Sequence, residues 1–251
     1  LRKEMAIEVI RNVRQNHQNN LFYIEAPTGG GKTNLSLLAT IELLKIYEGQ
    51  YSKVFYVFPF TTLITQTYAV VRDMLGLKEE EIIELHSKSG LKSGSGEDDN
   101  YGDKRLNYIN YLFVNYPFCL LSHIRFFDIL KSNEKEANYL LHRLANSIVV
   151  IDELQSYNPS QWDKVIYFIR QYADKFNIKF ILMSATLPKL DKLNVINEDV
   201  NDFVYLLPDA KELYFNNPNF AGRVNFNFDL FNKKDLPLQE LADKVIQSST
   251  D

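Results

Sequence analysis

The sequence is poor in cysteine and contains no long apolar run. A single cysteine, Cys119, stands among its 251 residues, so no internal disulfide can form. It lies in an apolar stretch, where a cysteine usually packs as a small core residue. No apolar run approaches the length of a membrane span, and the N-terminus has no signal-peptide pattern. These absences exclude a disulfide framework and favour a reduced, cytoplasmic protein with no membrane partner.

The sequence also lacks an excess of positive charge and a cluster of histidines. Its net charge is −4, so there is no global electrostatic attraction to nucleic acid, and any such contact must come from a local groove. The four histidines show no close spacing typical of metal ligands. With 45% hydrophobic residues, the chain can bury one sizeable α/β core.

Strand and helix patterns alternate along most of the chain. Short β-branched and aromatic runs are typical of parallel strands buried on both faces, and the amphipathic segments between them predict helices. The pattern predicts an α/β fold, a mostly parallel sheet with helices on both faces. The expected strands are Phe22–Glu25, Val54–Phe58, Ile82–Leu85, Cys119–Ser122, Ile148–Ile151 and Phe180–Met183. The expected helices are Arg2–Asn16, Asn34–Tyr47, Thr62–Leu75, Arg125–Lys131, Glu134–Ala145 and Gln161–Phe176. The candidate inner residues of the first helix are Met5, Ile7, Val9, Ile10 and Val13.

Two stretches differ from this alternation. Lys88–Lys104 is rich in Gly, Ser, Asp and Lys and is typical of a surface loop. Asp191–Asn219 is polar and rich in asparagine, which indicates a connector. Period-two alternation over Arg223–Phe228 then predicts a half-exposed strand, and Leu238–Ser248 predicts a helix. Because the chain opens with Leu1 rather than Met and stops inside a helical pattern, we expect it to be an excised fragment.

The segment after the first strand has the composition of a phosphate-binding loop. It reads Ala26-Pro27-Thr28-Gly29-Gly30-Gly31-Lys32-Thr33 and departs from G-x-x-x-x-G-K-[ST] at Ala26. Three consecutive glycines let backbone N–H groups curl around phosphate oxygens, and the following helix adds the positive end of its dipole. Lys32 would contact the β- and γ-phosphates of ATP, and the Thr33 hydroxyl would ligate Mg²⁺. The alternative is a glycine-rich turn with a solvated lysine, but strand, glycines, Lys-Thr and helix all coincide here.

A second buried strand, Ile148–Ile151, ends directly in Asp152 and Glu153. Ligands in open α/β sheets bind at the carboxyl ends of strands, so both carboxylates are predicted to emerge near the phosphate loop. Asp152 would hold Mg²⁺, directly or through water, and Glu153 would orient and deprotonate the attacking water. Alone, such a strand end usually only caps the next helix. The phosphate loop upstream favours the catalytic interpretation.

A third strand, Phe180–Met183, ends in Ser184-Ala185-Thr186. In isolation this would be a simple strand-to-loop turn. With the other two elements present, Ser184 and Thr186 are candidate coupling residues. They would hydrogen-bond the Asp152–Gln155 segment and report the nucleotide state to the rest of the molecule.

The three elements together resemble the superfamily 2 helicases, whose first RecA-like lobe carries A-x-T-G-x-G-K-T, D-E-x-x and S-A-T in this order. Alanine at the first position is normal in that superfamily. Longer strings resemble the CRISPR-associated helicase-nuclease of type I interference systems. These strings are Phe58–Gln66, Leu85–Ser87, Leu140–Gln155 and Asn217–Val224, so the resemblance covers nearly the whole chain.

The resemblance implies a RecA-like P-loop NTPase fold with ATP and Mg²⁺ as cofactors. It places the first ATP-binding lobe at 1–188, a connector at 189–222 and the truncated start of a second lobe at 223–251. It implies ATP-driven 3′-to-5′ movement on single-stranded DNA, recruitment by an RNA-guided surveillance complex, and strand degradation by a separate HD nuclease domain. We find no His-Asp pair in a helical metal-ligand context, so that nuclease domain is expected to be absent from this chain. Without the arginine finger of a complete second lobe, we expect this chain, a monomer, to bind ATP–Mg²⁺ weakly and to hydrolyse it poorly.

The same resemblance places nucleic-acid contacts at two strand ends. Thr61 and Thr62 would cap the helix that follows Phe58 and offer hydroxyl and N–H donors to a phosphate. A plain helix cap explains these two threonines equally well. Ser122 and His123 form the second expected contact, and a structural role at the strand end explains His123 equally well.

Adenine recognition depends on single residues. The superfamily often reads adenine with a glutamine or arginine upstream of the phosphate loop. Arg2 is our choice over Gln15 and Gln18, and an exposed charge at a helix start is the alternative for any of them.

Gln155 bears on catalysis and on the choice of polymer. DEAD-box RNA helicases carry Asp at this place, and many DNA-acting relatives carry His. Glutamine keeps a donor and an acceptor, so it can bridge to the γ-phosphate or to Ser184, and we count it with Lys32 and Glu153 as a catalytic candidate.

Two other hypotheses about the function stay open. One is a different superfamily 2 ATPase, such as an RNA helicase or a duplex translocase. The other is a non-catalytic docking module that binds nucleotide only as a switch.

Overall fold

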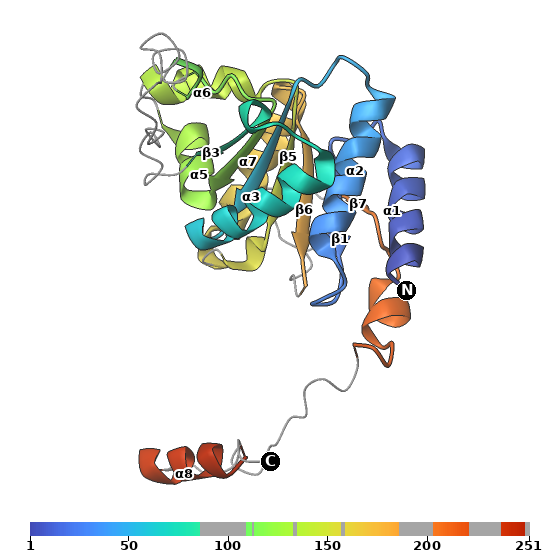
Figure 1. Cartoon of the computed structure of the whole chain (residues 1–251), viewed down its shortest axis with the longest axis vertical. Helices are drawn as coiled ribbons and strands as arrows, with labels where there is room; N and C mark the ends of the chain where they lie inside the picture. Colours follow the sequence, from blue (N-terminus) through green and yellow to red (C-terminus); the bar gives the residue numbers. More distant parts are fainter. Residues whose placement is uncertain are drawn as a thin grey trace. The chain divides into compact units, whose positions relative to one another are not determined.

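The computed structural model describes residues 1–85, 109–111, 113–132, 135–156, 159–185, 203–220 and 237–248. The chain divides into two compact units, Leu1–Phe215 and Asn216–Asp251. In the described part of the second unit, helix α8 (Leu238–Ser248) coincides with the predicted helix. The sheet and its covering helices lie in the first unit (Figure 1).

The strands of the first unit form one seven-stranded sheet in the order β3-β4-β2-β5-β6-β1-β7. Every pairing is parallel, which confirms the predicted α/β class. The strands are β1 (Leu21–Glu25), β2 (Lys53–Phe58), β3 (Ile82–Leu85), β4 (Phe118–Ser122), β5 (Ser147–Asp152), β6 (Lys179–Ser184) and β7 (Val204–Tyr205). The six predicted strands are all present, each within one residue of its predicted ends.

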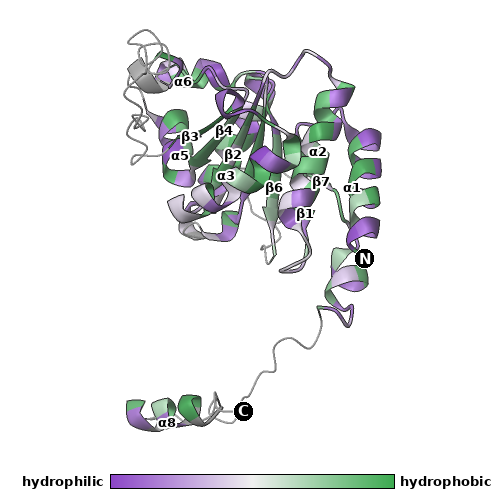
Figure 2. Cartoon of the chain, viewed as in Figure 1, coloured by the Kyte–Doolittle hydropathy of each residue, from purple (hydrophilic) through white to green (hydrophobic). Residues whose placement is uncertain are grey.

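Helices cover both faces of the sheet. One face carries α1 (Arg2–Asn16), α2 (Lys32–Ile46) and α3 (Thr61–Leu75), and the other carries α5 (His123–Lys131), α6 (Lys135–Leu144) and α7 (Trp162–Lys175). Short 3₁₀ turns follow β5 at Leu154–Ser156 and precede β3 and α7 at Glu79–Glu81 and Pro159–Gln161. Figure 2 shows apolar strands between helices in which apolar and polar residues alternate.

Each strand contributes to two separate cores, because successive side chains point to opposite faces. In β2, Val54 and Tyr56 pack under α1, α2 and α3, whereas Phe55 and Val57 pack under α5, α6 and α7. Burial on both faces explains why these strands are continuous apolar runs without polar alternation.

The inner face of α1 is narrower than predicted. Met5, Val9 and Val13 are fully buried at four-residue spacing, but Ile7 is 57% exposed. Residues four apart lie on one face of a helix, and Ile7 stands two positions out of that row. The prediction that Ile7 points inward was therefore wrong.

The order of the strands brings the predicted motifs to one rim. Strand β6 lies between β5 and β1, with Ser184 opposite Glu25 and Met183 opposite Asp152. The segments that leave these three strands therefore start side by side at the carboxyl rim. Strands β2 and β4 end at the same rim, with Phe58 opposite Ser122.

Part of the expected connector belongs to the first unit. Strand β7 adds to the free edge of β1, and a π-helical turn at Lys211–Phe215 follows it. Leu206, Leu207 and Tyr214 are buried in the core under α1. The lobe and connector boundaries remain predictions. Thr186, His86-Ser87, Lys88–Lys104 and Arg223–Phe228 lie outside the described residues.

Candidate active site

The predicted phosphate loop connects β1 to α2 and is fixed at its base. Ala26 N–H donates to the Ser184 carbonyl of the neighbouring strand at 3.3 Å, and Gly30 N–H donates to the Pro27 carbonyl at 2.8 Å. Gly31 has a φ of 88°, in the left-handed region that side-chain-bearing residues rarely adopt. A Cβ on Gly30 would lie 2.8 Å from the Pro27 carbonyl oxygen. The glycines are therefore required by the curvature of the loop.

Helix α2 begins at Lys32 with its N-terminus at this loop. Gly31 is the N-cap and supplies no side-chain hydrogen bond to the first turn. The free N–H groups and the positive end of the helix dipole form an anion-binding arrangement. Lys32 and Thr33 occupy the first two helical positions, so the helix begins two residues before the predicted start at Asn34. Their contacts to phosphate and Mg²⁺ remain predictions.

Lys32 and Glu153 meet across the carboxyl rim. Lys32 Nζ lies 3.0 Å from Glu153 Oε1, and their side chains are 13% and 29% exposed. Glu153 has a φ of 49°, and its N–H donates to the Met183 carbonyl at 3.0 Å. A left-handed non-glycine residue costs about 1–3 kcal/mol and persists only where surrounding contacts hold it. Here the turn directs the carboxylate to the lysine of the phosphate loop.

A chain of side-chain hydrogen bonds continues from Glu153 to the third motif. Gln155 Nε2 donates to Glu153 Oε2, and Ser184 Oγ donates to Gln155 Oε1 at 2.6 Å. The predicted contact between Ser184 and the Asp152–Gln155 segment is thus present. The loop lysine, the carboxylate, the amide and the strand-end hydroxyl form one connected network.

Asp152 lies at the same rim, where it is largely buried. Its Oδ1 atom is buried and has no hydrogen-bond partner among the described residues. Burial, and secondarily the charge of Glu153, raise the pKa of Asp152 to about 7, although Lys32 opposes this shift. Burying a carboxylate oxygen without a partner is costly, and coordination to a divalent cation would supply the partner that Oδ1 lacks. The chemistry of Asp152 therefore fits Mg²⁺, which Asp152 and the Thr33 hydroxyl would hold.

A groove of about 1080 Å³ opens elsewhere on this rim, where β2 and β4 end. Most of the residues that line it are apolar or aromatic, and its polar lining includes Thr61, Thr62, Ser122 and Arg125. Phe60 is the N-cap of α3 and makes no side-chain cap bond, so the expectation that Thr61 and Thr62 cap this helix was wrong. They are the first two residues of α3 and are exposed.

The structure gives different roles to Ser122 and His123, the second pair of expected nucleic-acid contacts. Ser122 caps α5, since its Oγ accepts a hydrogen bond from Arg125 N–H at 3.3 Å. His123 is only 3% exposed, and its Nε2 lies 2.9 Å from the Asp152 carbonyl oxygen. Burial lowers the pKa of His123 to about 4, so the ring is neutral at neutral pH. The expectation of a direct nucleic-acid contact by His123 is corrected, because its ring faces inward.

Comparison with known proteins gives the family of this chain. The sequence profile of the DEAD/DEAH box helicases matches residues 3–193. The chain belongs to this family. It is the ATP-binding domain of a superfamily 2 helicase, and the recognition of a RecA-like lobe is confirmed.

One curated relative is the CRISPR-associated nuclease/helicase Cas3 of Haloferax volcanii. It is 24% identical over an alignment of 234 residues that covers 81% of this chain and 24% of that protein. This helicase chain thus spans about a quarter of the length of the relative. Among solved structures, the Hef helicase domain of Pyrococcus furiosus is similar with a TM-score of 0.52 and 16% identity, over 86% of this chain and 40% of that one. The UvsW helicase of bacteriophage T4 matches more loosely, with a TM-score of 0.42 and 17% identity over 67% of this chain and 48% of that one.

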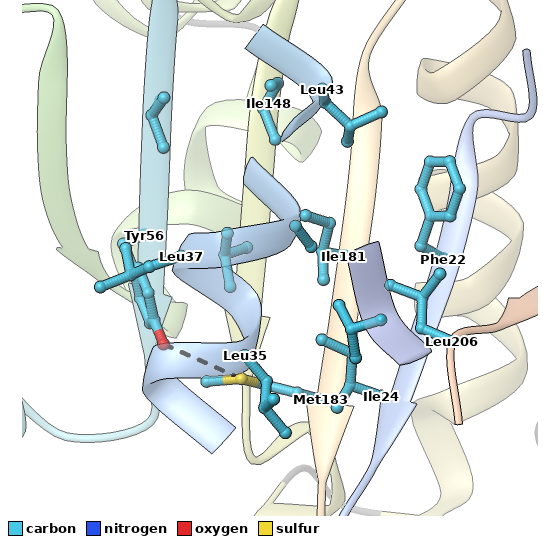
Figure 3. Packing of buried hydrophobic residues seen from close by; sticks show 14 of the residues in the cluster. Phe22, Ile24, Leu35, Leu37, Leu43, Tyr56, Ile148, Ile181, Met183 and Leu206 are labelled. Carbon is cyan, nitrogen blue, oxygen red and sulfur yellow. Dashed lines mark hydrogen bonds between the residues drawn. The ribbon is translucent and has the colours of Figure 1, made fainter. Parts of the chain in front are cut away.

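Sequence reasoning missed one buried residue of this helicase domain, Tyr56. It is fully buried on β2, with its hydroxyl 3.1 Å from Ser36 Oγ and 3.8 Å from Met183 Sδ (Figure 3). Burial and the charge of Asp152 raise its pKa, while hydrogen bonds to the side chains of Ser36 and Thr33 oppose the shift. Tyr56 thus joins the first turn of α2 to the ends of β2 and β6. In sequence it is one more aromatic residue of an apolar strand, so no local signal marks it.

The candidate adenine reader of the helicase lies beside the phosphate loop. Arg2 Nη2 donates to the Gly29 carbonyl at 2.8 Å. Gln15 lies near the other end of α1 and Gln18 lies beyond it. Thirteen helical rises place Gln15 roughly 20 Å from Arg2. Of the three candidates, only Arg2 is near the loop, and its role in adenine binding remains a prediction. None of the helices that the structure describes combines the length and apolar composition needed to cross a bilayer.

Proposed function

We propose that this chain is the first motor lobe of an ATP-driven single-stranded DNA translocase in type I CRISPR interference. The observation that carries the ATPase part is the meeting of Lys32 and Glu153 at one rim, next to the buried Oδ1 atom of Asp152, which has no hydrogen-bond partner among the described residues. In the intact protein, an RNA-guided surveillance complex would recruit the motor, and an HD nuclease domain would degrade the displaced strand. The lobe at 1–188, the connector at 189–222 and the second-lobe start at 223–251 belong to the same proposal.

The network at the rim supports a catalytic sequence for Lys32 and Glu153. Lys32 Nζ and Glu153 Oε1 form an ion pair at 3.0 Å. A triphosphate carries more negative charge than one carboxylate and would attract Lys32 into the phosphate loop. Glu153 would then be released to accept a proton from the attacking water, while Gln155 and Ser184 hold its second oxygen in place. Mg²⁺, when bound by Asp152 and Thr33, supplies neutralisation of phosphate charge.

The groove at the ends of β2 and β4 supports a nucleic-acid role. Thr61 and Thr62 present exposed hydroxyls at the N-terminus of α3, and the exposed Arg125 adds a positive charge. Hydroxyls, helix N-termini and arginines are common phosphate contacts. With a net charge of −4, the chain has no bulk attraction to nucleic acid, so a local groove must supply it. Thr61, Thr62 and Ser122 are the proposed contacts.

The CRISPR part of the proposal depends on the relative. That relative is a CRISPR-associated nuclease/helicase, and the similarity extends over 81% of this chain. DNA as the substrate is inferred from the same similarity. The remaining hypotheses, an RNA helicase, a duplex translocase or a nucleotide switch, differ in which polymer accelerates ATP hydrolysis.

The test is steady-state ATP hydrolysis by the intact protein with single-stranded DNA, single-stranded RNA and duplex DNA of matched length. Single-stranded DNA should raise kcat most, and strand displacement should require ATP. Stimulation by RNA alone or by duplex alone would replace the DNA translocase with the corresponding alternative. Nucleotide binding without hydrolysis under any of the three conditions would favour the switch.

A further inference from the structure

The His123 ring connects the groove to the catalytic carboxylates. It lies at the first position of α5, next to Ser122, and the following residues Ile124 and Arg125 are exposed in the groove. Its Nε2 lies 2.9 Å from the carbonyl oxygen of Asp152. A carbonyl oxygen can only accept, so Nε2 carries the proton and donates. Ser156 Oγ lies 3.5 Å from Nδ1 on the other side of the ring.

The carbonyl that His123 contacts belongs to the peptide between Asp152 and Glu153. The N–H of that same peptide donates to the Met183 carbonyl at 3.0 Å. Both polar groups of one peptide plane are therefore fixed, one by α5 and one by β6. The orientation of this plane sets the φ of Glu153, which at 49° is the strained angle that directs its carboxylate to Lys32.

We propose that His123 is a positioning residue that transmits occupancy of the nucleic-acid groove to Glu153 through the Asp152–Glu153 peptide. A strand that moves the N-terminus of α5 necessarily moves the ring, because His123 is the first residue of that helix. The hydrogen bond then carries the movement to the peptide that orients the general base. This inference rests on the proposed function, since it requires nucleic acid to bind in the groove.

The test compares two replacements of His123 in the intact protein. His123→Leu removes the donor and keeps an apolar side chain, whereas His123→Gln retains an N–H donor. We expect His123→Leu to lower the DNA-stimulated kcat about tenfold, with the KM for ATP and the Kd for single-stranded DNA within about twofold of the parent. His123→Gln should recover most of that loss.

The matched control is Phe127→Leu. Phe127 is buried on the same helix, and its side chain is part of the hydrophobic core. This variant should lose thermal stability yet keep its DNA-stimulated kcat. A DNA-stimulated kcat of His123→Leu equal to that of the parent, or losses of equal size in His123→Leu and Phe127→Leu, would overturn the proposal.

Failure of the proposed function looks different. It would appear in the unsubstituted protein, as hydrolysis that single-stranded DNA does not accelerate. If RNA or duplex stimulates instead, the same comparison is made with that polymer, and His123 is judged on it. If no polymer stimulates hydrolysis, both proposals are wrong.

Discussion

Two lysines at opposite rims of the sheet make contrasting contacts. Lys32, at the carboxyl rim, has a carboxylate partner, Glu153, at 3.0 Å. Lys179, at the amino rim, donates to the backbone carbonyls of His17 and Asn19, each at 2.8 Å. The described partners of Lys179 are neutral, whereas the partner of Lys32 is charged and partly exposed.

The contrast separates a contact that can be exchanged from one that holds the fold. Lys179 is 1% exposed, and its ammonium also donates to Asn20 Oδ1 at 3.2 Å and lies 4.8 Å from the centre of the Tyr47 ring. Lys53 at the start of β2 repeats this pattern, donating to the carbonyls of Val114 and Tyr116. Backbone carbonyls do not leave the site, so these lysines fasten loops to the sheet. A phosphate can take the place of the carboxylate on Lys32.

The largest effect is expected when the exchangeable contact between Lys32 and Glu153 is removed. Glu153→Gln should lower kcat for ATP by about 10²–10⁴-fold, because the amide cannot accept the proton of water. Nucleotide affinity should stay within a few-fold, as measured by titration with a fluorescent analogue. The matched control is Glu25→Gln, at the same rim and 3.4 Å from Lys211, which should retain kcat within about twofold. An unaltered kcat in Glu153→Gln would reject Glu153 as the base.

The second largest effect is expected when the fixed contacts of Lys179 with the backbone carbonyls are removed. Lys179→Met should lower the free energy of unfolding by about 1–3 kcal/mol, because buried carbonyls lose their donor. The kcat per folded molecule should change little, since the amino rim is remote from the site. Denaturant unfolding measures the loss, with the exposed Lys45→Met as a control expected within about 0.5 kcal/mol of the parent. If Lys179→Met lowered kcat without lowering stability, the assignment of a structural role to the amino rim and a catalytic role to the carboxyl rim would be contradicted.

A smaller effect concerns the network that holds Glu153. Ser184→Ala removes the hydroxyl that donates to Gln155 at 2.6 Å. One hydrogen bond is worth about 1 kcal/mol, so kcat should fall roughly fivefold to tenfold. Single-turnover hydrolysis would measure the chemical step. A normal rate would show that Gln155 keeps Glu153 in place without Ser184.

A further prediction concerns how the contribution of Lys179 to stability depends on pH. Burial lowers the pKa of Lys179 from 10.5 to about 8 in the folded protein. The unfolded chain therefore binds more protons between these values, and the contribution of Lys179 to stability rises with pH across the window. The penalty is fully present below about pH 8. The stability of the parent relative to Lys179→Met should thus increase from about pH 7 to about pH 9.5 in paired denaturant titrations. If this stability difference does not change with pH, the hydrogen-bond acceptors of Lys179 and the Tyr47 ring offset the effect of burial on its pKa.

Most of the fold could be predicted because its signals are local. Continuous apolar runs marked the strands, and helical periodicity placed α1 and α8 at their observed ends. The error at Ile7 came from counting apolar residues without knowing how wide a stripe the neighbouring elements would cover. Strand β7 was missed because two residues in a polar stretch carry no detectable pattern, and its place is decided by the free edge of β1.

The sequence by itself determined the fold class, the glycine-rich loop and the carboxylates at the end of β5, since each is encoded in a few consecutive residues. Only the tertiary structure decided that Lys32 pairs with Glu153, that Tyr56 lies beneath the loop and that His123 turns inward to the Asp152–Glu153 peptide. The physical reason is that periodicity records whether a side chain is buried, whereas its partner depends on which strands become neighbours. That order, with β6 between β5 and β1, is not a property of any one segment.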